Sequence, residues 1–169
     1  MSSANLHSFV VPIITRVLTN LRAVTEKGAA HAEAKKIDPA SLINFRLYPD
    51  MLPFSSQIQI ATDASKGCLA RLAGIDAPRF EDTEKTFGEL FARIEKTLAF
   101  VGSVKPEQTE GAEQRAIVIK TPSAELNFTG LTYVQGFVIP NLLFHATTAY
   151  NILRHNGVEI GKMDFLGRP

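Results

Sequence analysis

Four stretches of the chain place apolar residues at alternating spacings of three and four, the repeat that gives an amphipathic α-helix its buried stripe. In the first stretch, Leu6, Val10 and Ile13 begin a series that continues to Val24. A helix with one apolar stripe must bury it against another element, and four such helices can close around one core. The spacing therefore predicts an all-α fold, a helical bundle, in a single domain spanning residues 1–169.

Helix caps and helix breakers set the expected limits of the four helices. The predicted ranges are about 5–27, stopped by Gly28; about 51–73, capped by Asp50; about 84–101, capped by Asp82 or Thr83; and 140–157, from Pro140 to Gly157.

Shorter elements are expected between and after these helices. Asp38 and Pro39 predict a short helical turn that runs to Ile43. Residues 116–119 and 126–128 alternate as two strands of a short β-hairpin, with a turn near Pro122 and Ser123. Thr129 is expected to cap a further helical segment, and the tail, residues 158–169, is expected to pack as an extended strap.

Composition and charge exclude several classes of protein. The 18 basic and 17 acidic residues nearly balance, and no basic run is present, so we expect no nucleic-acid partner. The first apolar stretch is interrupted by His7, Pro12 and Arg16, so we expect no membrane span. Cys68 is the single cysteine, which rules out an intrachain disulfide and a cysteine-based zinc site. A reducing, cytoplasmic location is the expectation.

The candidate site lies between the second and the last helix. His145 lies near the apolar stripe of the last helix, and Gln57 lies on the same face of the second helix as Ala61 and Ser65. We expect His145 to be a core histidine that bonds a partner such as Gln57; a catalytic or metal-ligand role is the alternative. The small side chains beside Gln57 leave room for a small-molecule ligand. Tyr133, Asn141 and Tyr150 are expected to join these two residues in ligand binding.

Three phrases of the sequence resemble an uncharacterised bacterial family, a domain of unknown function. They are RLYPDMLPFSSQIQIATDASKG (46–67), RLAG (71–74) and PNLLFHATTAYNILRHNGVEIGKMDFLG (140–167). That family is grouped with the DinB/YfiT-like metalloenzyme superfamily. The resemblance implies a DinB-like four-helix bundle in up-down-down-up order, often a homodimer. In the wider superfamily, three histidines from the second and last helices hold a divalent metal. Some members of that superfamily are thiol-dependent transferases or isomerases.

The ligand set of that superfamily does not carry over to this sequence. His145 matches one ligand position, but the second helix contains no histidine and offers only Gln57 and Asp63 as oxygen donors. His155 lies about 15 Å along the helix from His145 and faces elsewhere. We therefore assign no metal ligands and leave the cofactor open.

These observations leave three functional hypotheses. The first is a small-ligand-binding or structural protein that keeps the bundle without its metal. The second is a metal- or thiol-dependent transferase or isomerase that uses His145, and the third is a dimerisation module that acts through a partner protein. A homodimer is expected because the apolar coverage of the first helix is wider than one stripe; it includes Phe9, Ile13, Ile14, Val17, Leu18 and Leu21.

Overall fold

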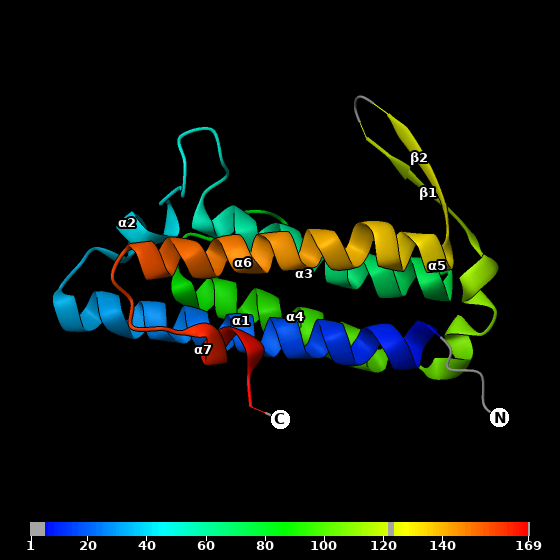
Figure 1. Cartoon of the computed structure of the whole chain (residues 1–169), viewed down its shortest axis with the longest axis horizontal. Coiled ribbons are helices and arrows are strands. Elements are labelled where there is room, and N and C mark those ends of the chain that lie inside the picture. The colour runs from blue at the N-terminus through cyan, green and yellow to red at the C-terminus, as the bar shows by residue number, and fades with distance from the viewer. Residues whose placement is uncertain (1–5, 122–123, 169) are drawn as a thin grey trace.

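The computed structural model describes residues 6–121 and 124–168, and its main body is a bundle of four helices. These are α1 (Leu6–Lys35), α3 (Phe54–Ala73), α4 (Phe87–Ser103) and α6 (Ile139–His155). In Figure 1, α1 and α6 run in one direction, and α3 and α4 run in the other. The predicted all-α bundle in up-down-down-up order is therefore confirmed.

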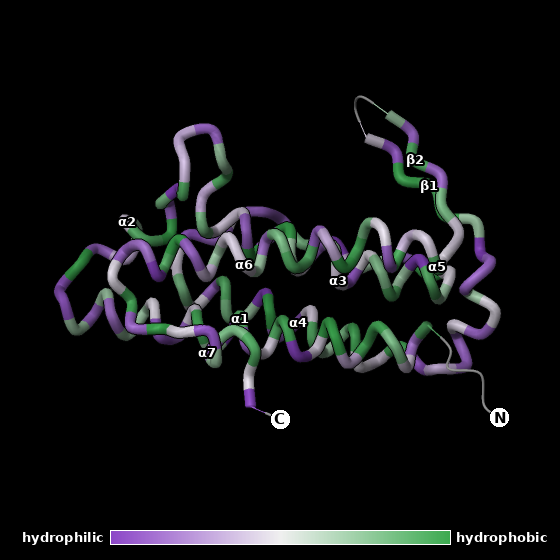
Figure 2. The backbone as a smooth tube through the Cα atoms, in the orientation of Figure 1, coloured by the Kyte–Doolittle hydropathy of each residue, from purple (hydrophilic) through white to green (hydrophobic). Residues whose placement is uncertain are grey.

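The order of the helices requires one long crossover. Because α3 and α4 are parallel, residues 74–86 must run back along the bundle before α4 can begin (Figure 1). α3 packs between α4 and α6, and α1 contacts the same two helices from the opposite side. Figure 2 shows apolar and polar residues alternating along each helix, as expected for helices that bury one stripe.

Helix α1 is longer than the sequence predicted. Gly28 does not end it; the helix continues to Lys35, and Lys36 has the left-handed φ of 54° that follows its end. Gly28 is buried instead, and a Cβ built on it would lie 3.0 Å from the methyl groups of Leu153. The glycine thus permits close packing of α1 against α6. The expected start at Asn5 lies outside the described residues.

Helices α3 and α4 begin later than predicted, because other residues cap them. The cap of α3 is Pro53 rather than Asp50, and residues 45–54 form a loop closed by a 2.9 Å bond from the backbone N–H of Phe54 to the carbonyl of Phe45. Thr86, rather than Asp82 or Thr83, caps α4. Its hydroxyl accepts from the N–H of Glu89, whose carboxylate in turn accepts from the N–H of Thr86 at 2.9 Å.

The short elements lie mostly where the sequence placed them. Asp38 caps α2 (Pro39–Ile43), and β1 (Ala116–Lys120) pairs antiparallel with β2 (Glu125–Thr129). The turn predicted near Pro122 and Ser123 falls outside the described residues. Two one-turn 3-10 helices, Pro106–Thr109 and Ala112–Gln114, precede the hairpin.

The last helix starts earlier than Pro140. Thr129 caps α5 (Gly130–Tyr133) as predicted, and a π-helical turn, Val134–Val138, joins α5 to α6 without a break. The tail is not simply extended: it forms α7 (Lys162–Leu166), where the carboxylate of Asp164 accepts from the N–H of Gly161. This tail is fixed to α1 by bonds from Asn20 and Lys27.

The buried apolar residues form one continuous cluster, to which all four long helices contribute. Among residues 6–121 and 124–168, no helix combines the length and apolar character needed to cross a bilayer.

Candidate functional site

His145 and Gln57 meet between α6 and α3. The Nδ1 atom of His145 lies 2.7 Å from the Oε1 atom of Gln57, and both side chains are buried, with 9% and 1% of their surface exposed. The structure therefore brings together the two residues on which the sequence-based site was built.

The second bond of Gln57 fixes the proton on the imidazole. The Nε2 atom of Gln57 donates to the carbonyl of Leu52 at 2.8 Å, so its Oε1 atom is the one that faces His145. An amide oxygen only accepts, and Nδ1 of His145 must therefore carry the hydrogen. Burial lowers the pKa of His145, which favours the neutral ring. A neutral ring with hydrogen on Nδ1 presents a lone pair at Nε2.

That lone pair can accept a hydrogen bond from a ligand. Among the described residues, a fully buried side-chain nitrogen or oxygen without a hydrogen-bond partner occurs at Nε of Arg22 and not at His145. Because Nε2 of His145 has no bonded partner of its own, it is therefore not sealed in the core. The ring of Phe144 meets the imidazole edge-on, with 5.2 Å between the centroids. The arrangement provides a fixed, uncharged hydrogen-bond acceptor next to an aromatic surface.

A separate groove lies on the outer side of α6, and neither His145 nor Gln57 lines it. Its volume is about 450 Å³. One wall is formed by Leu47 and Met51 of the loop 45–54, and the other by α6 residues that include Phe144 and Thr148. His145 follows Phe144 in α6 but faces α3, where Gln57 bonds both His145 and the carbonyl of Leu52 in the loop. The pair thus ties the loop 45–54 to α6.

The remaining predicted site residues are spread along α6 and α5. Asn141 is half-buried and lies one helical turn before His145, on the same side of the helix. Tyr150 is also half-buried, but its ring meets Phe165 of α7 and its hydroxyl donates to the carbonyl of Ile160 at 3.4 Å. Tyr150 therefore contacts the tail rather than Gln57.

Tyr133 lies at the other end of the bundle from His145. Twelve residues of continuous helix separate the two, a rise of about 18 Å. The Tyr133 ring is buried, its hydroxyl accepts a 3.1 Å bond from Arg71, and burial raises its pKa to about 12. The structure does not bring Tyr133 together with His145 and Gln57.

The residues around His145 do not form a metal-ligand set. Asp63, the carboxylate considered from the sequence, is bound to Lys66 at 2.9 Å and to Arg93 at 2.8 Å. Among residues 6–121 and 124–168, no three histidine, cysteine, aspartate or glutamate side chains gather closely enough to hold a metal ion. The small residues beside Gln57 are packed: Ala61 and Ser65 have no exposed surface, and Ser65 donates to the carbonyl of Ala61.

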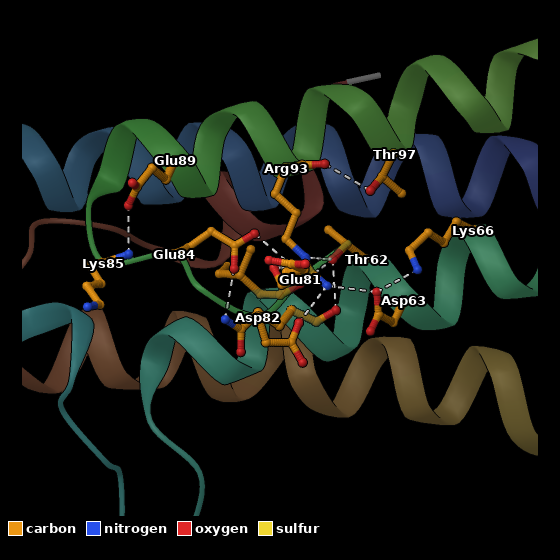
Figure 3. Close-up of polar contacts among 12 residues, drawn as sticks. Thr62, Asp63, Lys66, Glu81, Asp82, Glu84, Lys85, Glu89, Arg93 and Thr97 are labelled. Carbon is orange, nitrogen blue, oxygen red and sulfur yellow. Dashed lines mark hydrogen bonds and ion pairs between the residues drawn. The ribbon is translucent and has the colours of Figure 1, made fainter. Parts of the chain in front are cut away.

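A second polar cluster, which the sequence analysis did not identify, surrounds Arg93 of α4 (Figure 3). The Arg93 side chain is buried, and each of its three guanidinium nitrogens donates at least one hydrogen bond. Nε donates to Thr62, and the terminal nitrogens donate to the carbonyl of Glu81 and to the carboxylates of Glu84 and Asp63, at 2.8–3.2 Å. The carboxylate of Asp82 forms an ion pair with one terminal nitrogen at 3.0 Å.

The charges of this cluster stabilise one another. Burial alone would lower the pKa of Arg93, but the bond to Glu84 and the nearby carboxylates raise it. Burial would likewise raise the pKa of Glu84, but bonds from Arg93 and Gln59 outweigh burial and lower it. Because three carboxylates already surround the guanidinium, the cluster serves as a clasp that holds the crossover to α3 and α4 rather than as an anion site.

Comparisons with known proteins agree with this fold. Residues 6–166 match a family described as a domain of unknown function (DUF1993). A crystal structure of a DinB family member protein from Shewanella denitrificans is similar, with a TM-score of 0.89 and 40% sequence identity over 97% of this chain and 93% of that chain. No curated protein matches the sequence. The resemblance to a DinB-like family of unknown function, which the sequence indicated, is therefore confirmed.

Proposed function

This chain belongs to the DUF1993 family of domains of unknown function, and we propose that it is a metal-free, DinB-like bundle that binds a small molecule at His145. The observation that carries the proposal is the 2.7 Å bond between Nδ1 of His145 and Oε1 of Gln57. It commits one ring nitrogen to the protein and leaves the other as an acceptor. A ligand with an O–H or N–H group can satisfy that acceptor.

The donor set argues against a tightly held transition metal. A stable zinc or nickel site needs three or more well-placed nitrogen, oxygen or sulfur ligands. Here the side chain that faces His145 from α3 is an amide, and its oxygen and nitrogen already bond His145 and Leu52. A metal at Nε2 of His145 would find fewer than three histidine, cysteine, aspartate or glutamate ligands among the described residues.

Titration with phenol tests the proposed acceptor. Phenol has an apolar ring and one O–H donor, and we expect it to shift the ring ¹⁵N signal of His145 Nε2 in a saturable way at pH 7.5. His145→Ala should remove this signal, which assigns it to His145. His155→Ala is the matched control, since His155 is exposed at the end of the same helix and should leave the response unchanged. A His145 signal that does not move with phenol would remove the proposed site.

Metal analysis distinguishes this proposal from the enzyme hypothesis. Protein purified without an affinity tag is expected to contain well under one equivalent of zinc, nickel or iron, and its unfolding curve should not change with a chelator. One equivalent of metal that a chelator removes, with lower stability, would instead support a metal-dependent transferase or isomerase that uses His145.

We also propose that the protein forms a homodimer in the cytoplasm. Phe9 has 46% of its surface exposed, and Ile13 and Val17, which follow it at intervals of four, are only half-buried. These three residues form an apolar line on the outside of α1, and a two-fold partner could cover it. Light scattering at micromolar concentration should give twice the chain mass of 18.5 kDa, and Phe9→Lys should give the chain mass.

A further inference from the structure

We propose that a cleft between α4 and the crossover 74–86 binds a small zwitterion, namely an α-amino acid with an uncharged polar side chain. The cleft has a volume of about 310 Å³, at the lower end of the roughly 300–1,000 Å³ typical of small-molecule sites. One wall comes from the crossover between Arg79 and Glu84, and the other from the face of α4 that carries Glu89, Arg93 and Lys96. His145 and Gln57 do not line this cleft, so the inference goes beyond the proposed function and does not rest on it.

The Arg93 clasp holds the two walls together (Figure 3). Arg93 of α4 donates to the carboxylate of Glu84 at 2.9 Å and to the carbonyl of Glu81 at 3.2 Å, both in the crossover. The ring of Phe80 lies near two cationic groups, 5.5 Å from the guanidinium of Arg93 and 4.8 Å from the ammonium of Lys66. A cleft that is already formed does not need to be ordered by its ligand, so less binding free energy is lost.

The crossover that forms one wall is long and contains neither helix nor strand. Connections of this length without secondary structure are uncommon in compact domains, and those that are ordered frequently carry a function. A wall of a binding cleft is such a function.

The charges that line the cleft are balanced. They divide equally into three cations and three anions: Arg79, Arg93 and Lys96, and Glu81, Glu84 and Glu89. A ligand with a net charge would be attracted by one set of groups and repelled by the other. A zwitterion has one charge for each set, so balanced lining charges favour it.

Three of the six charged groups are available to a ligand. The other three are already used, in the clasp and in the cap of α4. The guanidinium of Arg79, the ammonium of Lys96 and the carboxylate of Glu81 make no ion pair or hydrogen bond with any other residue in the ranges 6–121 and 124–168. The two cations suit the carboxylate of an amino acid, since a guanidinium binds a carboxylate through paired N–H donors, and Glu81 suits its ammonium.

The rest of the lining favours a polar side chain on the amino acid. Phe80 and Ala92 are its two apolar residues, and Thr83 adds a hydroxyl group to the charged ones. An apolar side chain would displace water from these polar groups without replacing its hydrogen bonds, which is unfavourable.

Calorimetric titration with L-glutamine tests the inference. This amino acid carries one ammonium, one carboxylate and an uncharged polar side chain. We expect saturable binding, and at least tenfold weaker binding of L-glutaminamide, which lacks the carboxylate, and of N-acetyl-L-glutamine, which lacks the ammonium. Absence of saturable binding, or an analogue that binds as tightly as L-glutamine, would overturn the assignment to zwitterions.

Matched charge variants locate the bound L-glutamine. Lys96→Gln and Glu81→Gln each remove a charge that has no partner among the described residues, and each should weaken binding at least tenfold. Lys105→Gln and Glu107→Gln are the controls, because both residues are exposed and lie outside the cleft. Far-UV circular dichroism confirms folding of all four variants. Unchanged binding by Lys96→Gln or by Glu81→Gln would overturn the cleft assignment.

The cleft and the His145 site are tested separately. L-Glutamine should leave the ring ¹⁵N signal of His145 unchanged, and His145→Ala should bind L-glutamine as the wild type does. Loss of L-glutamine binding by His145→Ala would place the amino acid at His145 and overturn the inference. Failure of the phenol titration would remove the His145 site and leave the cleft standing.

Discussion

Replacing Arg93 by alanine should destabilise the fold by about 3 kcal/mol at pH 7. Removing one partner from a buried ion pair costs about 3–5 kcal/mol, because the other partner stays buried without compensation. We expect the lower end of that range, since the side chains of Asp63 and Asp82 are 42% and 59% exposed and water can solvate them. Glu84, with 11% of its side chain exposed, carries most of the loss.

The loss should depend on pH in a defined direction. The pKa of Glu84 is lower in the folded state than in an unfolded chain, where it is about 4.3. Its ion pair therefore stabilises the fold fully above about pH 4.3, and this contribution disappears as the pH falls through the lower folded-state pKa. The difference between wild type and Arg93→Ala should shrink over the same interval, because protonated Glu84 no longer needs Arg93.

Urea unfolding followed by circular dichroism from pH 7 to pH 3.5 measures both effects. Arg22→Ala is the matched control, since Arg22 makes ion pairs with Glu26 and Glu95 at the surface, with 35% of its side chain exposed. Such exposed pairs contribute up to about 1 kcal/mol. The clasp would be refuted if Arg93→Ala lost no more stability than Arg22→Ala, or if its loss were the same at pH 7 and pH 3.5.

Two further predictions concern glycine packing and the thiol. Gly130→Ala should destabilise the fold by about 3 kcal/mol, because the new Cβ would lie 1.8 Å from the carbonyl oxygen of Ala112. Gly28→Ala meets only the methyl ends of the Leu153 side chain, at 3.0 Å, and alanine has the higher helix propensity, so this variant should stay within about 1 kcal/mol of wild type in the same urea assay. Cys68 has no exposed surface, and burial raises the pKa of its thiol to about 12. A disulfide reagent at pH 8 should therefore label Cys68 only after unfolding. Rapid labelling of the native protein would contradict this prediction.

The sequence predicted those features that are set by local spacing. The three-four repeat located all four helices, and alternation with turn residues located the hairpin, because both patterns are properties of one element. Helix ends were predicted less well. Thr86 and the earlier Asp82 and Thr83 are all good caps, and Thr86 is the one whose partner, Glu89, lies three residues into the helix.

Gly28 shows why a local rule can give the wrong helix limit. In isolation a glycine after an apolar series indicates a helix end, because it adopts left-handed φ values easily. In the folded chain, Gly28 lies opposite Leu153, and its lack of a side chain lets α1 and α6 pack closely there. That partner is 125 residues away, and no property of the first helix alone identifies it.

The candidate site was predictable in part. The inward position of His145 and the position of Gln57 follow from helical periodicity, and their contact follows once α3 and α6 are neighbours. The Arg93 clasp had a weaker signal. Arg93 lies close to the apolar stripe of α4, between Leu90 and Thr97, and an acidic run precedes the helix. Recognising the clasp also required knowing that the crossover returns beside Thr62 of α3.

Polar residues on two faces of α3 determine which helices can be its neighbours. Gln57 bonds His145 of α6, and Thr62 accepts from Arg93 of α4; five residues apart, they point about 140° away from each other around the helix. Apolar stripes alone would tolerate several arrangements of α4 and α6, because apolar contacts have little directional preference. An α4 placed elsewhere would leave Arg93 buried without its carboxylates, at a cost of several kcal/mol. The two bonded pairs therefore favour the observed order, in which α3 packs between α4 and α6.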